Sequence, residues 1–130
     1  MNNAVIIPAR MGSSRFPGKP LINILGLPMV IHVWFRCKMS KEVDEVYIAT
    51  CDKKIQDICI KYGAKVIMTS KKHKMCMDRV VEASKKIKAK NIITVQGDEP
   101  LIQPKDIDLI AKKLNKIKKN ETISLIQKIK

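Results

Sequence analysis

The sequence AVIIP at residues 4–8 runs directly into ARMGSSRFPGKPL at residues 9–21, and this stretch decides the fold. A short, unbroken apolar run is typical of a central parallel strand that is buried on both faces. The glycines and prolines that follow predict a loop at the carboxyl end of that strand. Because open α/β sheets bind ligands beyond the carboxyl ends of their strands, we expect this loop to contribute to a binding site.

Strands and helices are predicted to alternate along the rest of the chain. Apolar runs and alternation predict strands at residues 4–8, 43–50, 65–68, 91–95 and 122–129. Apolar residues at helical spacing predict helices that begin near Pro28, after Asp52 as the N-cap, near Asp78 and at Pro104. Gly63 should end the second helix, and the third should reach about residue 88. This order predicts an α/β fold in which helices cover both faces of a mostly parallel sheet.

The composition is that of one globular domain. The chain has 130 residues, of which 45% are apolar but only 4% aromatic, so aliphatic side chains must fill the core. No apolar run approaches the roughly 20 residues of a membrane span, and the first residues lead straight into a strand without a signal peptide. The four cysteines, Cys37, Cys51, Cys59 and Cys76, form no C-x-x-C pair. Three of them fall where a helix or strand would bury them, so we expect packing and a reduced thiol state. These features predict a cytoplasmic protein without a membrane partner.

The net charge of +14 raises the question of nucleic-acid binding. Of the 26 basic residues 22 are lysine, and they are spread over the predicted helices rather than gathered in a block interleaved with aromatic residues. We therefore expect a solvated lysine-rich surface rather than a nucleic-acid site. Such a surface would still attract an anionic substrate such as a nucleoside triphosphate.

The loop after the first strand has the residue types that bind a triphosphate. Its backbone can approach oxygen atoms closely at Gly12, and its cationic side chains can neutralise phosphate charge. We predict that the following residues bind nucleotide: Arg10, Gly12, Ser13, Arg15 and Lys19. The loop differs from a Walker A motif, because proline stands after the lysine where serine or threonine would hold magnesium.

A second polar turn, VQGDEP at residues 95–100, follows the fourth predicted strand. Asp98 in this turn suits a Mg²⁺ ion that bridges a carboxylate and phosphate oxygens. The alternative is an ordinary turn in which Asp and Gly serve the backbone geometry. If the strands at 4–8 and 91–95 are neighbours, this turn and the basic loop open into one cleft.

The two loops together resemble a known family. The pattern I-I-P-A-R-x-x-S-x-R-x-P-G-K-P-L at 6–21, joined to V-Q-G-D-E-P at 95–100, is similar to the 3-deoxy-manno-octulosonate cytidylyltransferases, also called CMP-KDO synthetases. The first half of the pattern is shared with wider nucleotidyltransferases, and the second half narrows the match. The resemblance spans essentially all of residues 1–130 but only the first half of family members. It implies a single nucleotide-binding part with a truncated three-layer α/β/α, Rossmann-like sheet of the nucleotide-diphospho-sugar transferase type.

The resemblance also implies a reaction: CTP and KDO give CMP-KDO and pyrophosphate, with Mg²⁺, for lipopolysaccharide synthesis. The positions that hold the triphosphate in the family match Arg10, Ser13, Arg15 and Lys19 here. Asp98 matches the magnesium ligand, and Gln96 lies where the acid sugar sits. The resemblance thus assigns Arg10, Lys19 and Asp98 to the transfer step.

Two departures from the family pattern affect the expected activity. Where the family has H-x-S-G-T-[DE]-R, this chain has HKMCMDR at residues 73–79, so a hydroxyl cap is lost and bulk could crowd the cytidine. His73 in this run could contact a nucleotide phosphate, whereas His32 is predicted to be structural. The family's other metal-binding carboxylate lies in its second half, so we expect these 130 residues to be weakly active or inactive alone.

Three alternatives remain open at this point. The chain could be a basic nucleotide- or nucleic-acid-binding module without chemistry. It could be a cytidylyltransferase for another acid sugar. The sheet edge left open by the absent half could also pair with another copy of the chain.

Overall fold

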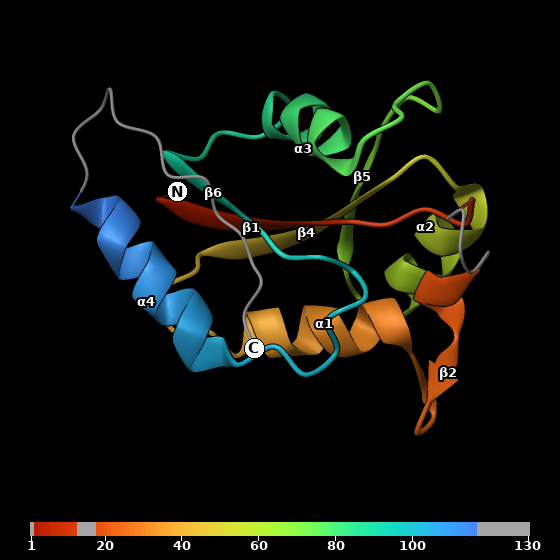
Figure 1. Cartoon of the computed structure of the whole chain (residues 1–130), viewed down its shortest axis with the longest axis horizontal. Coiled ribbons are helices and arrows are strands. Elements are labelled where there is room, and N and C mark those ends of the chain that lie inside the picture. Colours follow the sequence, from red (N-terminus) through yellow and green to blue (C-terminus); the bar gives the residue numbers. More distant parts are fainter. Residues whose placement is uncertain (1, 13–17, 117–130) are drawn as a thin grey trace.

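The computed structural model describes residues 2–12 and 18–116, and in it a parallel sheet forms the centre of the molecule (Figure 1). Its strands are β1 (Asn3–Pro8), β4 (Glu45–Thr50), β5 (Lys65–Met68) and β6 (Asn91–Thr94). They lie in the order β5-β4-β1-β6, and every neighbouring pair is parallel. The first four predicted strands are confirmed to within two residues. The strand predicted at 122–129 falls outside the described residues.

Helices cover both faces of this sheet, so the three-layer prediction is confirmed. The helices are α1 (Met29–Lys38), α2 (Lys53–Lys61), α3 (Cys76–Ser84) and α4 (Pro104–Asn115). Figure 1 shows α3 above the sheet and α1 and α4 below it. The larger apolar cluster joins the sheet to α1, α2 and α4, and a smaller one joins it to α3.

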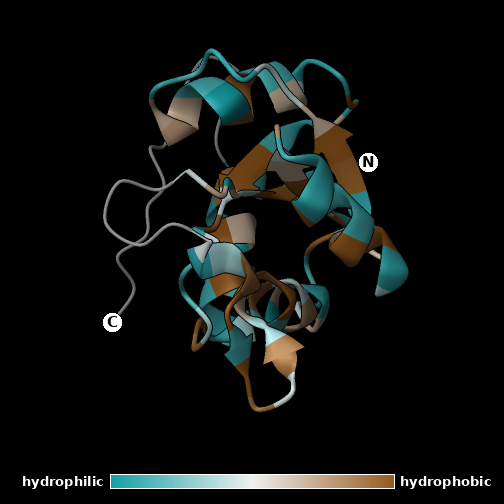
Figure 2. Ribbon diagram, turned by 90° about the vertical axis from the view of Figure 1, so that its right-hand side faces the viewer, coloured by the Kyte–Doolittle hydropathy of each residue, from teal (hydrophilic) through white to brown (hydrophobic). Residues whose placement is uncertain are grey.

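β1 is buried along its whole length because it lies between the two apolar clusters. Val5 and Ile7 point into the larger cluster, whereas Ile6 points into the smaller one, as the alternation of a strand requires. Each such side chain contributes about 1.5–3 kcal/mol through burial. Figure 2 shows the same arrangement, with hydrophobic strands enclosed by helices whose outer sides are hydrophilic. The AVIIP run is therefore the central strand that the sequence predicts.

The segment that leads into the first helix differs from the prediction. Pro28 is not in the first helical turn: it is the N-cap of α1 and ends a hairpin of β2 (Asn23–Ile24) and β3 (Leu27–Pro28), which the sequence analysis missed. The two-residue turn of this hairpin has φ of 52° at Leu25 and 92° at Gly26, as a type I′ turn requires. His32 contacts the Ile24 carbonyl oxygen, which is a structural role.

The third helix is shorter than predicted. It begins at Cys76 and ends at Ser84 rather than near residue 88. Beyond Ser84 the backbone closes tighter turns, in which the N–H groups of Lys86 and Ile87 donate to carbonyl oxygens three residues back. This tightening brings Ile87 against the smaller apolar cluster. The end of α2 is as predicted, because Gly63 follows it with φ of 91°.

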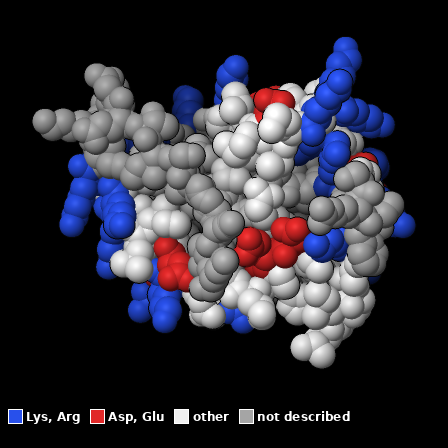
Figure 3. Space-filling model, viewed as in Figure 1, with Lys and Arg blue, Asp and Glu red and all other residues white. Residues whose placement is uncertain are grey.

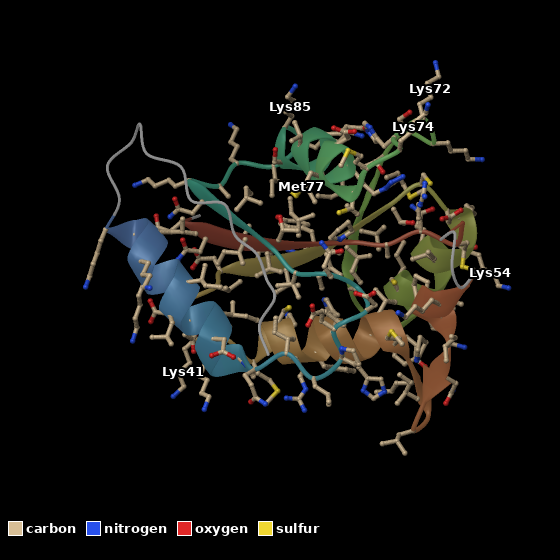
Figure 4. The ribbon with its side chains drawn as sticks, viewed as in Figure 1. Lys41, Lys54, Lys72, Lys74, Met77 and Lys85 are labelled. Atoms are coloured by element: carbon tan, nitrogen blue, oxygen red, sulfur yellow. The ribbon has the colours of Figure 1, made fainter. Side chains whose placement is uncertain are left out.

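Lysines are spread around the molecule rather than gathered in one block, as the sequence predicts. In Figure 3 the Lys and Arg side chains ring the outline of the molecule, with small groups of Asp and Glu between them. Figure 4 shows lysines projecting outward at separate places: Lys41 beyond α1, Lys54 on α2, Lys72 and Lys74 before α3, and Lys85 after it. None of the helices within the described ranges has the length and apolarity needed to span a membrane.

Both edges of the sheet are open within the described part of the chain, and the β6 edge is the one that the predicted pairing concerns. β6 pairs with β1 on one side, and no described strand pairs with its other side. An edge of this kind offers unpaired backbone groups to another strand. Pairing with another copy of the chain at this edge remains a prediction.

Candidate nucleotide-binding site

A cleft of about 270 Å³ opens at the carboxyl ends of β1 and β6. Its walls come from the loop after β1, the turn after β6 and the start of α3. The lining residues are Pro8, Ala9, Arg10, Lys19, Pro20, His73, Lys74, Met75, Cys76, Arg79, Gln96, Gly97 and Asp98. Four of them are arginine or lysine and one is acidic, so the cleft is chemically suited to an anion.

The loop after β1 is held at both of its ends. The N–H of Ala9 donates to the Ala49 carbonyl at 2.9 Å, and that of Gly18 donates to the Met11 carbonyl at 2.8 Å. Gly18 has φ of 80°, which favours glycine at this turn. It leads into a short 3-10 helix (Lys19–Leu21) that places Lys19 in the cleft wall.

Asp52 has a different role from the one predicted. It stands at the N-cap position of α2, but its side chain makes no capping hydrogen bond there. Instead, its Oδ2 accepts a hydrogen bond of 2.7 Å from the N–H of Met11. Asp52 therefore holds the loop after β1 to the junction between β4 and α2. This contact joins residues that are far apart in the sequence.

Lys19 and Asp98 meet at the mouth of the cleft. The Lys19 Nζ lies 3.3 Å from the Asp98 Oδ2, and the two side chains are 37% and 51% exposed. The pairing of β1 with β6 brings the two loops together, and the expectation that they open into one cleft is confirmed. Because the pair is exposed, it stabilises the fold little and is free to exchange partners when a ligand enters.

Gly97 allows the turn after β6 to pack against the end of β1. A Cβ atom at this position would lie 3.1 Å from the Pro8 carbonyl oxygen and 3.6 Å from the Ala9 Cβ. Only glycine leaves this space free, and the close approach sets the positions of Gln96 and Asp98 on either side. The Gln96 amide then donates to the Cys76 Sγ at 3.6 Å, which connects the turn to α3.

His73 lies in the cleft wall and is anchored to Glu82 of α3. The distance from His73 Nε2 to Glu82 Oε1 is 2.7 Å. Glu82 also accepts a hydrogen bond from the N–H of Ser70 at 2.9 Å and pairs with Lys86 at 3.1 Å. The Ser70 N–H, then His73 and Lys86, lower the pKa of Glu82 to about 2. Glu82 thus joins the loop before α3 to the helix itself.

Replacing Glu82 with glutamine should reduce stability at neutral pH and flatten its acid dependence. Because the folded-state pKa of Glu82 is about 2, below its ordinary 4.5, its contribution is full above pH 4.5 and is lost as pH falls towards 2. Urea unfolding from pH 7 to pH 2 should show the wild-type and Glu82→Gln free energies of unfolding converging in that interval. Parallel curves would contradict this role.

The HKMCMDR run at residues 73–79 places fewer bulky side chains in the cleft than its sequence predicts. Met75 and Cys76 line the cleft, but Met77 is not among the lining residues. Met75 is the N-cap of α3 and makes no side-chain capping bond, so the predicted loss of a hydroxyl cap is confirmed. Bulk at this wall thus comes from Met75 and Cys76.

The cysteines divide into two groups. Cys37 and Cys59 are buried, and burial raises the pKa of each thiol to about 12, as the predicted packing role requires. Cys51 is half-buried and Cys76 is exposed in the cleft, so packing does not describe them. All four thiols are free.

The structure brings most of the predicted site residues together. Those that line the cleft are Arg10, Lys19, His73, Gln96 and Asp98. Gly12 lies in the first loop but not in the lining, and Ser13 and Arg15 fall outside the described residues. The sequence analysis did not single out Arg79 or Gly97. For Gly97, the sequence offered one signal, which was its position between a predicted strand and the acidic residue Asp98.

The donor atoms for a metal are few. Among residues 2–12 and 18–116, no three His, Cys, Asp or Glu side chains are grouped so that they could hold an ion. Asp98 is the acidic residue of the cleft lining. Proteins often bind Mg²⁺ through one or two carboxylates together with substrate phosphates and water, and Asp98 suits the ion in this way.

A parallel sheet between two layers of helices, with a cation-rich cleft at the carboxyl ends of its strands, places the chain in the class of three-layer α/β proteins with a ligand cleft at that edge. A family model described as cytidylyltransferase matches residues 4–130, and the chain belongs to that family.

Similar proteins are known in several organisms. The chain is 46% identical over 111 residues to the 3-deoxy-manno-octulosonate cytidylyltransferase of Escherichia coli, a match that covers 85% of this chain and 45% of that enzyme. It is also 46% identical over 111 residues to an 8-amino-3,8-dideoxy-manno-octulosonate cytidylyltransferase of Shewanella, covering 83% of this chain and 45% of that enzyme. The chain therefore spans about half the length of these relatives.

A solved structure supports the fold assignment. The structure of a CMP:2-keto-3-deoxy-manno-octonic acid synthetase complexed with CTP superposes with a TM-score of 0.86 at 41% identity. The match covers 88% of this chain and 48% of that one. The nucleotidyltransferase-type α/β sheet implied by the two loop motifs is thus confirmed.

Proposed function

We propose that residues 1–130 form the nucleotide-binding part of a cytidylyltransferase that binds CTP and transfers CMP to the acid sugar KDO, releasing pyrophosphate. The observation that carries this proposal is the meeting of Lys19 and Asp98 at the carboxyl ends of β1 and β6, inside a cleft with three further cationic side chains. The CTP complex of the similar synthetase supports the choice of nucleotide.

The cleft residues would act by positioning and by charge stabilisation. Arg10 and Lys19, with Ser13 and Arg15 of the same loop, would neutralise the triphosphate, and Gln96 would orient the acid sugar. The anomeric hydroxyl of the sugar then attacks the α-phosphorus in line. A new O–P bond forms, the bond to pyrophosphate breaks, and the hydroxyl proton passes to water or to the released pyrophosphate.

We infer that Asp98 supplies one ligand to Mg²⁺ and that the nucleotide supplies others. The ion, when bound, neutralises charge on the phosphate oxygens. On nucleotide entry the exposed Lys19–Asp98 pair would separate, so that Lys19 turns to phosphate and Asp98 becomes available as a ligand. His73 would contact phosphate only at the expense of its bond to Glu82.

The acid sugar and the biological setting belong to this proposal as well. Relatives named for KDO and for its 8-amino derivative are equally identical to this chain, so both sugars are candidate acceptors, with KDO the first to test. We propose a role in lipopolysaccharide synthesis because relatives are named for KDO, and we propose the cytoplasm as its location because the four free thiols suit a reducing compartment.

The test is a comparison of ligands for the 130-residue chain. Calorimetric titration with CTP, UTP, ATP and GTP in the presence of Mg²⁺ should show saturable binding that is tightest for CTP. Pyrophosphate release with CTP and either acid sugar should be weak or absent, because the described cleft offers one carboxylate for the ion.

Other outcomes would favour the alternatives. Robust pyrophosphate release would contradict the expectation of weak activity while supporting the transferase. Binding to any nucleic acid that falls steeply with salt, without preference among nucleotides, would instead identify a basic module without chemistry.

A further inference from the structure

Arg79 is a buried cation in the wall of the cleft. It lies on α3, one turn after Cys76, and only 2% of its surface is exposed. Its guanidinium has five N–H groups and cannot lose its charge at any ordinary pH. Such a group is costly to bury unless it is paired with an anion and hydrogen-bonded.

The described part of the chain does not supply that pairing. No carboxylate within residues 2–12 and 18–116 forms an ion pair with Arg79. Its Nε–H is buried without a hydrogen-bond partner, and its Nη2 donates to the Cys51 Sγ at 3.5 Å. A thiol sulfur is a weak acceptor. Within the described residues, Arg79 is therefore a buried arginine whose side chain has one recorded hydrogen bond, to a thiol sulfur, and whose Nε–H has none.

The surroundings indicate what the missing partner is. Arg79 shares the cleft lining with Arg10, Lys19 and Lys74, and the single carboxylate there, Asp98, is already paired with Lys19. Because no carboxylate of the described residues pairs with Arg79, a partner that enters from the cleft would need to carry negative charge and to accept hydrogen bonds. Phosphate oxygens meet these requirements, because a guanidinium binds them through two parallel N–H···O bonds.

We propose that Arg79 is a phosphate ligand in the wall of this cleft, and that the nucleotide provides the counter-ion that no described carboxylate supplies to its buried guanidinium. This inference rests on the proposed function, since it names a further binding residue of the same site. Replacing Arg79 should therefore have two effects that replacing a surface lysine does not have. It removes a buried charge that no described carboxylate pairs with, and it removes a phosphate contact.

The experiment compares Arg79→Met with a matched control, Arg36→Met. Arg36 lies on α1, donates to the Ile102 carbonyl at 3.3 Å and is not part of the cleft lining. Calorimetry with inorganic pyrophosphate and with CTP should give dissociation constants about 10- to 100-fold higher for Arg79→Met, the range expected for charged hydrogen bonds. Arg36→Met should bind both ligands as the wild type does.

Two further measurements separate a phosphate ligand from a structural residue. The melting temperature of ligand-free Arg79→Met should equal or exceed that of the wild type, because methionine fills the site without a charge. The chain has only four arginines, so the Arg79 Nε–H resonance can be identified from its absence in Arg79→Met, or in Arg79→Lys if the first variant does not fold. It should shift when the wild type is saturated with pyrophosphate.

The possible failures are distinguishable. Unchanged pyrophosphate affinity in Arg79→Met, or no shift of the Arg79 resonance, together with weaker binding in Lys19→Ala, would overturn the inference and leave the proposed nucleotide site standing. Equal affinity for all nucleotides would contradict the proposed cytidylyltransferase, yet an Arg79-dependent affinity for pyrophosphate would still support the inference.

Discussion

Replacing Lys19 with alanine is expected to weaken CTP binding about 10- to 100-fold, because a charge-assisted contact with phosphate contributes about 1.5–3 kcal/mol. The same change should alter the free energy of unfolding by less than about 1 kcal/mol, because the ion pair that it removes is exposed. We expect a large effect on binding and a small effect on stability because Lys19 lies 3.3 Å from Asp98 and both side chains are partly exposed. Lys19 thus belongs to the binding site rather than to the framework.

The measurement is calorimetric titration with CTP alongside urea unfolding of the same variant. Lys65→Ala is the matched control, since Lys65 forms an ion pair of 2.8 Å with Glu45 at the opposite edge of the sheet. It should lose a comparable amount of stability and keep the CTP affinity of the wild type. Equal CTP affinity in Lys19→Ala and Lys65→Ala would place the nucleotide elsewhere.

Gly97→Val is expected to lower the free energy of unfolding by about 1–3 kcal/mol, the usual effect of overpacking. A Cβ atom at Gly97 would lie 3.1 Å from the backbone oxygen of Pro8, and backbone at the end of a central strand cannot easily shift. The added branches of valine would push the turn away from β1. Because Gln96 and Asp98 flank the glycine, the variant should also bind CTP more weakly.

Urea unfolding and CTP titration of a graded series test this prediction. Gly97→Ala should fall between the wild type and Gly97→Val in both measurements. Gly12→Ala is the control for stability, since a Cβ atom at Gly12 meets nothing within 4 Å. Wild-type stability in Gly97→Val would show that the turn moves freely and does not set the position of Asp98.

The structure also explains how a strongly basic chain can have a specific anion site. Most of the lysines labelled in Figure 4 project outward at separate places, on α2 and in the segments that flank α1 and α3, and there they are solvated and screened. In the cleft a few cations are held at set positions by backbone contacts, an ion pair and burial. Position and desolvation, rather than net charge, therefore distinguish the site from the surface.

Several features of the fold could be predicted from the sequence because they depend on local patterns. The AVIIP run is apolar on both sides of a strand, so it had to lie in the middle of a sheet. Gly63 ended the second helix through its own backbone freedom. The hairpin at β2 and β3 escaped notice because its turn uses Leu25, a residue that seldom adopts a positive φ.

Sequence by itself determined the order of strands and helices, the buried central strand and the kind of chemistry in the two loops, because these follow from side-chain type and from periodicity along the chain. Tertiary structure decided which side chains meet. In the folded protein Asp52 accepts a hydrogen bond from the backbone of Met11 instead of capping a helix, and His73 contacts Glu82. Arg79 is buried without a described carboxylate partner. Such contacts join residues that only the packing of helices on the sheet brings together, and no local pattern encodes that distance.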